Sequence, residues 1–145
     1  MIRPLTFDEL AGYSPRLLTE SSQLKRRGTV SPDLFLAKWE RLYRFNDGVV
    51  FGYWTGDLLA GSLGAMIADD LYSEMRIAYE LFWNVRRDAR LTHGWKELFT
   101  TYESWARARG AQSAYLSHWA DVPRLGDFFM KLGFAPSECL VRKDF

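Results

Sequence analysis

The sequence predicts a mixed α/β (α+β) fold built on a twisted sheet of about six strands. Two mainly apolar runs, Val49–Trp54 and Leu58–Ile67, are separated by the turn Thr55-Gly56-Asp57 and predict an antiparallel hairpin. A strand over Ile77–Val85, a helix from about Thr92 to Arg109 and a strand over Ala111–Trp119 follow, and such a unit places its strands parallel. The order β-α-α-β-β-β-α-β-α-β therefore joins an antiparallel half to a parallel half.

Length and composition predict one folded domain spanning residues 1–145. Hydrophobic residues make up 48% and aromatic residues 16% of the chain, which excludes a disordered protein. The formal net charge of +1 gives no support for strong general binding to nucleic acid. The one cysteine, Cys139, excludes an internal disulfide, and no cysteine–histidine cluster predicts a metal site.

The chain carries no pattern typical of a membrane protein. Its N-terminus lacks the apolar core of a signal peptide. The segment Gly48–Ala68 is long enough to span a bilayer, but the turn in its middle favours two strands. We therefore expect a protein of the reducing cytoplasm that does not bind membranes.

The N-terminal part predicts a strand and two helices. After a strand over Ile2–Leu5, Thr6 and Glu9 form a capping box for a helix that Gly12–Pro15 should interrupt. We expect a loop over Ser22–Gly28. The next helix begins at Ser31-Pro32, and its buried stripe is Leu34, Phe35, Lys38, Trp39, Leu42 and Tyr43.

The C-terminal part predicts a long helix, a short helix and a last strand. The long helix ends at Gly110 and buries Trp95, Leu98, Phe99, Tyr102, Trp105 and Ala106. A short helix over 123–132 follows, capped by Asp121, and Pro136–Phe145 should form the last strand.

Three arginines lie between the strand over Ile77–Val85 and the long helix. Arg86, Arg87 and Arg90 precede the expected helix N-terminus, where unpaired N–H groups and the helix dipole favour an anion. The pattern fits a phosphate site, and it also fits a solvated basic turn.

The chain resembles the GNAT superfamily of acyl-CoA-dependent N-acetyltransferases, most closely its small phage-encoded members. Three segments carry the resemblance: Val85–Arg90, Trp105–Ala111 and Phe128–Phe134. It implies a central sheet with helices on both faces, acetyl-CoA (CoA) as the cofactor, and transfer of acetyl to a primary amine by direct attack in a ternary complex. Backbone groups near Phe82, Trp83, Asn84 and Val85 would hold pantetheine, and Arg86, Arg87, Arg90, Leu91, Thr92, His93, Gly94 and Trp95 would surround the pyrophosphate.

The cofactor loop departs from the family pattern, Arg/Gln-x-x-Gly-x-Gly/Ala. His93 replaces the first glycine and Trp95 the final small residue, so Gly94 is the one glycine of the loop. Phe129 stands where the family often has a tyrosine acid and cannot donate a proton.

Glu80 is the candidate general base. A carboxylate in an apolar, central strand is rarely buried unless it has an ion-pair partner or a function. Alternation would place Glu80, Phe82 and Asn84 on one face of the sheet. The alternative is a structural salt bridge, for instance to Arg76. His118, at the end of the following strand, is a candidate base or relay, with a structural histidine as its alternative.

Tyr115 and Tyr102 are candidates to protonate the leaving thiolate, and Tyr102 also fits the core.

The acidic loop of Asp69, Asp70 and Glu74 could recruit a cationic amine, whereas Lys25, Arg26 and Arg27 would suit an anion. Both charged segments also fit solvated surfaces. Trp54, Trp83 and Trp119 would suit a substrate pocket or a homodimer surface. The acceptor stays open, from a small-molecule amine to a protein amine. The alternative function is a catalytically inactive binding protein of the same fold, encoded by a phage and acting on a host factor.

Overall fold

The computed structural model describes residues 1–26, 28, 30–118, 123–137 and 143. The chain forms two compact units, Met1–Tyr115 and Leu116–Phe145. The first unit carries the sheet and most of the predicted site residues.

One five-stranded sheet has the order β1-β2-β3-β4-β5. Its strands are β1 (Ile2–Pro4), β2 (Gly48–Thr55), β3 (Leu58–Asp69), β4 (Arg76–Val85) and β5 (Ser113–Tyr115). The first four are antiparallel neighbours, and β4 and β5 are parallel. The mixed sheet is therefore confirmed, with five strands among the described residues where we expected about six. The predicted last strand falls mostly outside the described residues.

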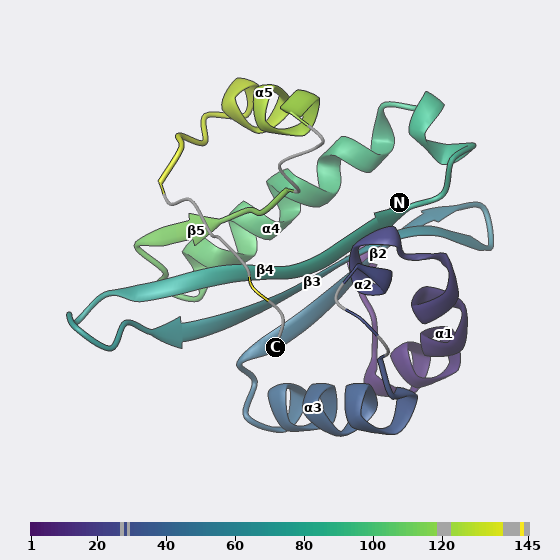
Figure 1. Cartoon of the computed structure of the whole chain (residues 1–145), viewed down its shortest axis with the longest axis horizontal. Helices are drawn as coiled ribbons and strands as arrows, with labels where there is room; N and C mark the ends of the chain where they lie inside the picture. Colours follow the sequence, from purple (N-terminus) through teal and green to yellow (C-terminus); the bar gives the residue numbers. More distant parts are fainter. Residues whose placement is uncertain (27, 29, 119–122, 138–142, 144–145) are drawn as a thin grey trace. The chain divides into compact units, whose positions relative to one another are not determined.

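Helices cover both faces of this sheet, as expected (Figure 1). On one face, α1 (Phe7–Glu20) packs against α3 (Pro32–Arg44). On the other, α4 (Glu97–Ala108) lies against β2 and β3. The core under α1 and α3 is apolar, and Phe82 of β4 packs there against Phe35 and Trp39 with ring centroids 6.2 and 5.7 Å apart.

Two predictions for the N-terminal helices were wrong. Helix α1 continues through Gly12 and Pro15. Proline removes the N–H that would bond to the carbonyl of Ala11, but the Ser14 hydroxyl donates to that carbonyl at 3.0 Å. The segment predicted as a loop after α1 contains the short helix α2 (Ser22–Lys25).

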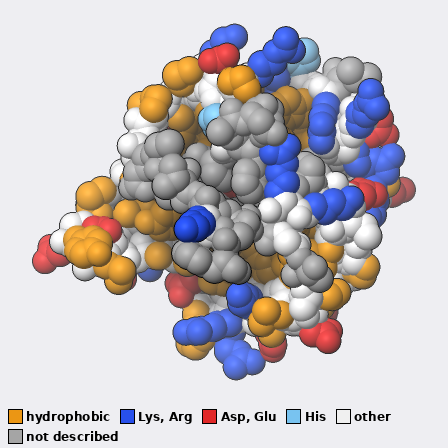
Figure 2. Space-filling view, viewed as in Figure 1, with side chains coloured by type: hydrophobic (Ala, Val, Ile, Leu, Met, Phe, Trp, Pro, Cys, Tyr) orange, Lys and Arg blue, Asp and Glu red, His pale blue; other side chains and the backbone are white. Residues whose placement is uncertain are grey.

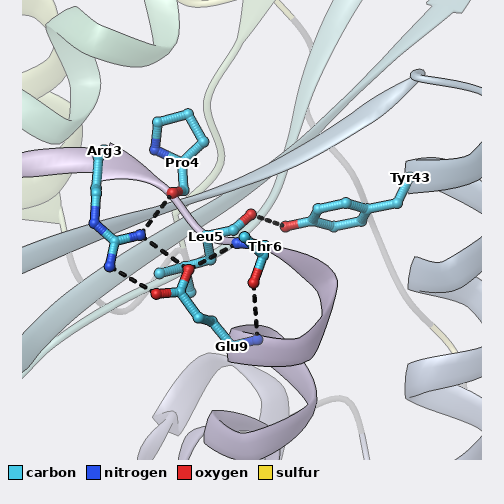
Figure 3. A network of polar contacts seen from close by, with 6 residues as sticks. All are labelled: Arg3, Pro4, Leu5, Thr6, Glu9 and Tyr43. Carbon is cyan, nitrogen blue, oxygen red and sulfur yellow. Dashed lines mark hydrogen bonds and ion pairs between the residues drawn. The ribbon is translucent and has the colours of Figure 1, made fainter.

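The junction of β1 and α1 is held by a polar network, shown in Figure 3. Thr6 and Glu9 form the predicted capping box, and both carboxylate oxygens of Glu9 accept from Arg3, at 2.7 and 2.9 Å. The Tyr43 hydroxyl of α3 donates to the carbonyl of Leu5 and accepts from the Val50 N–H. The network ties the first strand to α1, α3 and β2.

A β-bulge interrupts β4 at Leu81. Gly64 pairs with Phe82, but the next residue of β3, Ala65, pairs with Glu80. Consecutive residues of β3 point to opposite faces, so Glu80 and Phe82 do too. Our expectation that Glu80 shares a face with Phe82 and Asn84 was wrong, because one extra residue shifts the alternation.

The long helix begins later than predicted. Two 3-10 turns, Ala89–Leu91 and Gly94–Lys96, precede α4, whose first residue is Glu97. The arginines therefore do not lie at the N-terminus of a long helix. The second unit contains α5 (Pro123–Lys131), as predicted, with His118 and Phe129 in ring contact at 6.2 Å.

Candidate functional site

The parallel pairing of β4 and β5 stops before β4 ends. The paired residues are Ile77–Tyr79 and Ser113–Tyr115, whereas β4 continues to Val85 along β3. Within the described residues, the β5 side of Glu80–Val85 therefore has no strand partner. Backbone N–H and C=O groups on such an edge can hydrogen-bond a ligand that lies along it.

An open cavity of about 820 Å³ lies at the carboxyl end of β4. Its described lining residues come from β4, the following turn and the end of α1: Glu20, Asn84, Val85, Arg86, Arg87, Asp88 and Arg90. Three guanidinium groups and two carboxylates thus surround one hollow. Glu20 was not predicted, because only the tertiary fold brings the end of α1 beside this turn.

The three arginines have different partners. Arg86 is held by Asp88 through two contacts of 3.1 and 3.0 Å. Arg90 donates from Nε to the Val85 carbonyl at 2.8 Å, which fixes its side chain beside the end of β4. Among the described residues, Arg87 and the terminal nitrogens of Arg90 make no hydrogen bond or ion pair. These groups are positioned to receive an anion.

Buried polar groups lie beneath α1, next to this cavity. Tyr13 and Asn84 are nearly inaccessible, and the fully buried Ser62 hydroxyl has no hydrogen-bond partner among the described residues. Burial raises the pKa of the Tyr13 phenol. Of these three residues, Asn84 lines the cavity.

The turn after β4 is attached to β2. Tyr53 Oη and Thr92 Oγ1 lie 2.9 Å apart, and the Thr92 hydroxyl donates to the Ala89 carbonyl at 2.8 Å. A Cβ on Gly94 would lie 2.7 Å from Tyr53 Oη. A side chain at position 94 would therefore have to displace the ring of Tyr53, a residue that sequence reasoning missed.

Trp95 and His93 take different positions in this turn. Trp95 packs against Phe99 at 6.0 Å, and its Nε1 donates to the Arg90 carbonyl at 3.2 Å. The indole thus contacts α4 from the turn before it, and it is half-buried outside the helix whose stripe was expected to include it. His93 is exposed and precedes the second 3-10 turn. Thr92 is exposed as well, and Leu91 lies in the first 3-10 turn.

Glu80 is 7% exposed and is the first residue of β4 beyond the pairing with β5. It faces the α4 side, where Tyr102 lies fully buried. The Tyr102 hydroxyl is within 2.9 Å of the carbonyl oxygens of both Ala78 and Tyr115, so it joins β4 to β5 where the strands part. Burial, and secondarily the Glu80 carboxylate, raise the pKa of Tyr102. Tyr102 is therefore a protonated core residue.

The structure does not bring all three predicted catalytic side chains together. Tyr115 stacks on Tyr79 at 5.4 Å, on the face opposite Glu80. His118 lies beyond β5, in the second unit. Arg76, the partner considered for Glu80, is 3.7 Å from Asp69 of the neighbouring strand.

Side chains near Phe82–Val85 divide between the two faces. Phe82 enters the core under α3, whereas Trp83 packs against Phe99 of α4 at 5.6 Å. Both rings are therefore part of the packing, and what these residues can offer a ligand is their backbone. Asn84 and Val85 are the two residues of this group that line the cavity.

No protein-family model and no curated protein matches the sequence. Solved structures do match over the whole chain. An aminoglycoside acetyltransferase from an uncultured soil metagenomic sample, in complex with sisomicin, has a TM-score of 0.77 at 18% identity, with 100% of this chain and 94% of that chain covered. The fold is that of the GNAT acetyltransferases.

Two further structures have a similar fold. Glucosamine-6-phosphate N-acetyltransferase from Arabidopsis thaliana has a TM-score of 0.75 at 19% identity, covering 100% of this chain and 97% of that one. A transcriptional regulator from Bacillus halodurans C-125 has a TM-score of 0.82 at 18% identity, with 100% and 99% covered. In the described part of the chain, no group of metal-binding side chains occurs, and no helix is long and apolar enough to cross a membrane.

Proposed function

We propose that this protein is an acetyl-CoA-dependent N-acetyltransferase that moves acetyl to a primary amine by direct attack in a ternary complex. The observation that carries the proposal is the arginine-lined cavity at the end of β4, next to a strand edge that β5 leaves unpaired. A nucleotide-bearing thioester has two matching parts, an anionic diphosphate and an amide-rich arm. The arginines would bind the first and the backbone of Phe82–Val85 the second.

Arg87 and Arg90 are the proposed phosphate ligands, and Arg86 would join them on leaving Asp88. Charge-assisted hydrogen bonds of this kind contribute more than neutral ones. The loop supplies fewer glycines than the family pattern, so side chains would replace part of the backbone cradle.

Glu80 is the proposed base. Its carboxylate would take the proton of the acceptor ammonium, directly or through water, before the free amine attacks the thioester carbonyl and the thiolate of CoA leaves. Its burial near the open strand edge supports this role. Tyr115 and His118 stay candidates for delivering a proton to the thiolate.

Calorimetry with CoA tests the cofactor. We expect binding that Arg87→Ala/Arg90→Ala weakens at least about tenfold, as the loss of charged hydrogen bonds predicts. Arg44→Ala, a change at an exposed arginine of α3, is the control. Absence of binding heat and of thermal stabilisation by saturating CoA would contradict the proposal.

Glu80→Gln tests the chemistry. It should lower turnover by about 10²–10⁴ while leaving CoA affinity unchanged. The alternative function is that of a binding protein without catalytic activity. A protein described as a transcriptional regulator has a similar fold, and this likeness supports the alternative. CoA binding without turnover towards any amine would support that alternative.

A further inference from the structure

The loop between β3 and β4 presents an apolar tip. Leu71 is 90% and Tyr72 is 95% exposed, and Met75 is 37% exposed. The tip projects beyond the sheet at the left of Figure 1, and Figure 2 shows hydrophobic and acidic side chains gathered there. Large apolar groups held together in water in this way mark an interaction surface. We call residues 69–76 the tip.

Hydrogen bonds within the tip hold it in a defined turn. Asp70 Oδ2 accepts from the Ser73 hydroxyl at 2.7 Å and from the Tyr72 N–H at 3.3 Å. The Asp70 N–H donates to the Met75 carbonyl at 2.8 Å, which closes the turn. Because the turn is already ordered, little conformational entropy is lost when Leu71 and Tyr72 are buried by a partner.

A groove on the α3 side of the same hairpin complements the tip. It has a volume of about 690 Å³ and is mainly apolar. We call it the α3 groove. Its lining residues are Phe35, Trp39, Leu42, Phe45, Met66, Ile67 and Leu81, with Lys38, Arg41 and Asp47 as the charged members.

The charges of the tip and the α3 groove are opposite. The tip carries Asp69, Asp70 and Glu74 against the single cation Arg76. The α3 groove carries Lys38 and Arg41 against the single anion Asp47. Lys38 and Arg41 are exposed and have no ion-pair partner within the described ranges. An apolar tip with acidic flanks thus fits an apolar groove with a basic rim.

The tip and the groove also lie close together on one hairpin. Ile67 lines the groove, and Leu71 follows four residues later, roughly 13 Å along an extended strand. A tip cannot fold back into the groove of its own chain over so short a distance. A two-fold axis between two copies would instead place the tip of each copy in the α3 groove of the other. Both tips and both grooves are then occupied, so the assembly ends at a dimer.

We propose that the protein forms a two-fold dimer in which Leu71 and Tyr72 of each copy enter the α3 groove of the other. Four large apolar side chains leave water, and tyrosine is prominent among the residues that dominate interfaces. The surface is small for a permanent complex, so the association is weak and depends on concentration. The dimer does not depend on CoA binding or catalysis.

Sedimentation equilibrium from about 1 µM to 1 mM, the range of weak dissociation constants, tests the dimer. The mass of the wild type should rise from monomer to dimer and no further. Leu71→Ser/Tyr72→Ser should raise the dissociation constant at least about tenfold, which corresponds to 1.4 kcal/mol. Leu58→Ser, a change at an apolar residue that is 39% exposed at the other end of β3, should leave it unchanged.

A charge exchange tests the pairing of tip with groove. Glu74→Lys and Lys38→Glu should each weaken the homodimer, because both contacts then bring like charges together. An equimolar mixture of the two variants should associate again, because both contacts of the mixed dimer regain opposite charges. A monomeric wild type, assemblies beyond a dimer, an unaffected tip variant, or a mixture that stays monomeric would each overturn the proposal.

Discussion

The hydroxyl oxygens of Tyr53 and Thr92 lie 2.9 Å apart and join the end of β2 to the turn after β4. Since the Thr92 hydroxyl donates its one proton to the Ala89 carbonyl, the Tyr53 phenol must be the donor to Thr92. This bond fixes the turn that carries the three arginines. It takes the place of the long helix N-terminus that the sequence led us to expect there.

Tyr53→Phe should lower the free energy of unfolding by about 1 kcal/mol, the net contribution of one hydrogen bond. It should also weaken CoA binding, because the turn loses its attachment to β2. Denaturant unfolding and calorimetry measure the two effects. Tyr72→Phe, at an exposed phenol, is the control, and equal behaviour of the two variants would contradict a role for the Tyr53–Thr92 bond.

Gly94→Ala and Gly12→Ala should have opposite effects on stability. A Cβ at position 94 meets the Tyr53 ring and hydroxyl at 2.7–3.1 Å, so the buried ring must shift and the variant is destabilised. A Cβ at position 12, within helix α1, meets no atom within 4 Å, so alanine should stabilise the helix by about 0.5–1 kcal/mol. Thermal unfolding of both variants checks the signs, and a stabilised Gly94→Ala would refute the close approach of Tyr53.

Glu9 should make stability depend on pH in the acid range. Hydrogen bonding from Arg3 lowers the pKa of Glu9 from 4.5 to about 2. The folded carboxyl therefore takes up a proton less readily than the unfolded one, so its stabilising contribution is complete above pH 4.5 and is lost as the pH falls toward 2. Because the Arg3 and Glu9 side chains are 42% and 34% exposed, solvent screens the pair and the effect is modest.

Unfolding curves between pH 7 and pH 2 measure this effect. In Glu9→Gln the capping side chain is kept and the charge removed, so the difference in stability from the wild type should shrink below pH 4.5. Glu97→Gln, a change at an exposed carboxylate of α4, is the matched control. A difference between wild type and Glu9→Gln that is constant over this range would show that the Arg3–Glu9 pair has no such role.

Asp88→Asn should tighten CoA binding by about two- to fivefold, the scale of an exposed ion pair. Asp88 holds Arg86, so the phosphate proposed for this cavity must compete with a carboxylate. The amide removes the competing charge and can still accept from the Ala89 N–H. Asp57→Asn, which makes the same change in charge in the β2–β3 turn, is the control and should leave CoA binding unchanged. Weaker binding by Asp88→Asn would mean that Asp88 orients Arg86 for the ligand instead.

Patterns with a local physical cause were predicted correctly. The capping box of Thr6 and Glu9, the Ser31 cap of α3 and the hairpin of β2 and β3 depend on residues that are close in sequence. The strand β4, which we expected to be central, is the fourth of the five described strands. The one continuous helix through Pro15 was missed because the Ser14 side chain satisfies the freed carbonyl, a compensation that propensity does not register.

The sequence by itself determined the order of elements, the mixed sheet and the gathering of three arginines after β4, because alternation, caps and turns are local properties. Only the tertiary structure decided which way the site residues face. The bulge at Leu81 turned Glu80 away from Phe82, since register depends on the neighbouring strand. Two 3-10 turns stand where the helix start was expected, and Thr92 between them is bonded to Tyr53 of β2. The end of α1 brought Glu20 to the arginines. Contacts between residues far apart in the chain leave no local signal, so no pattern within β4 or its turn could have predicted them.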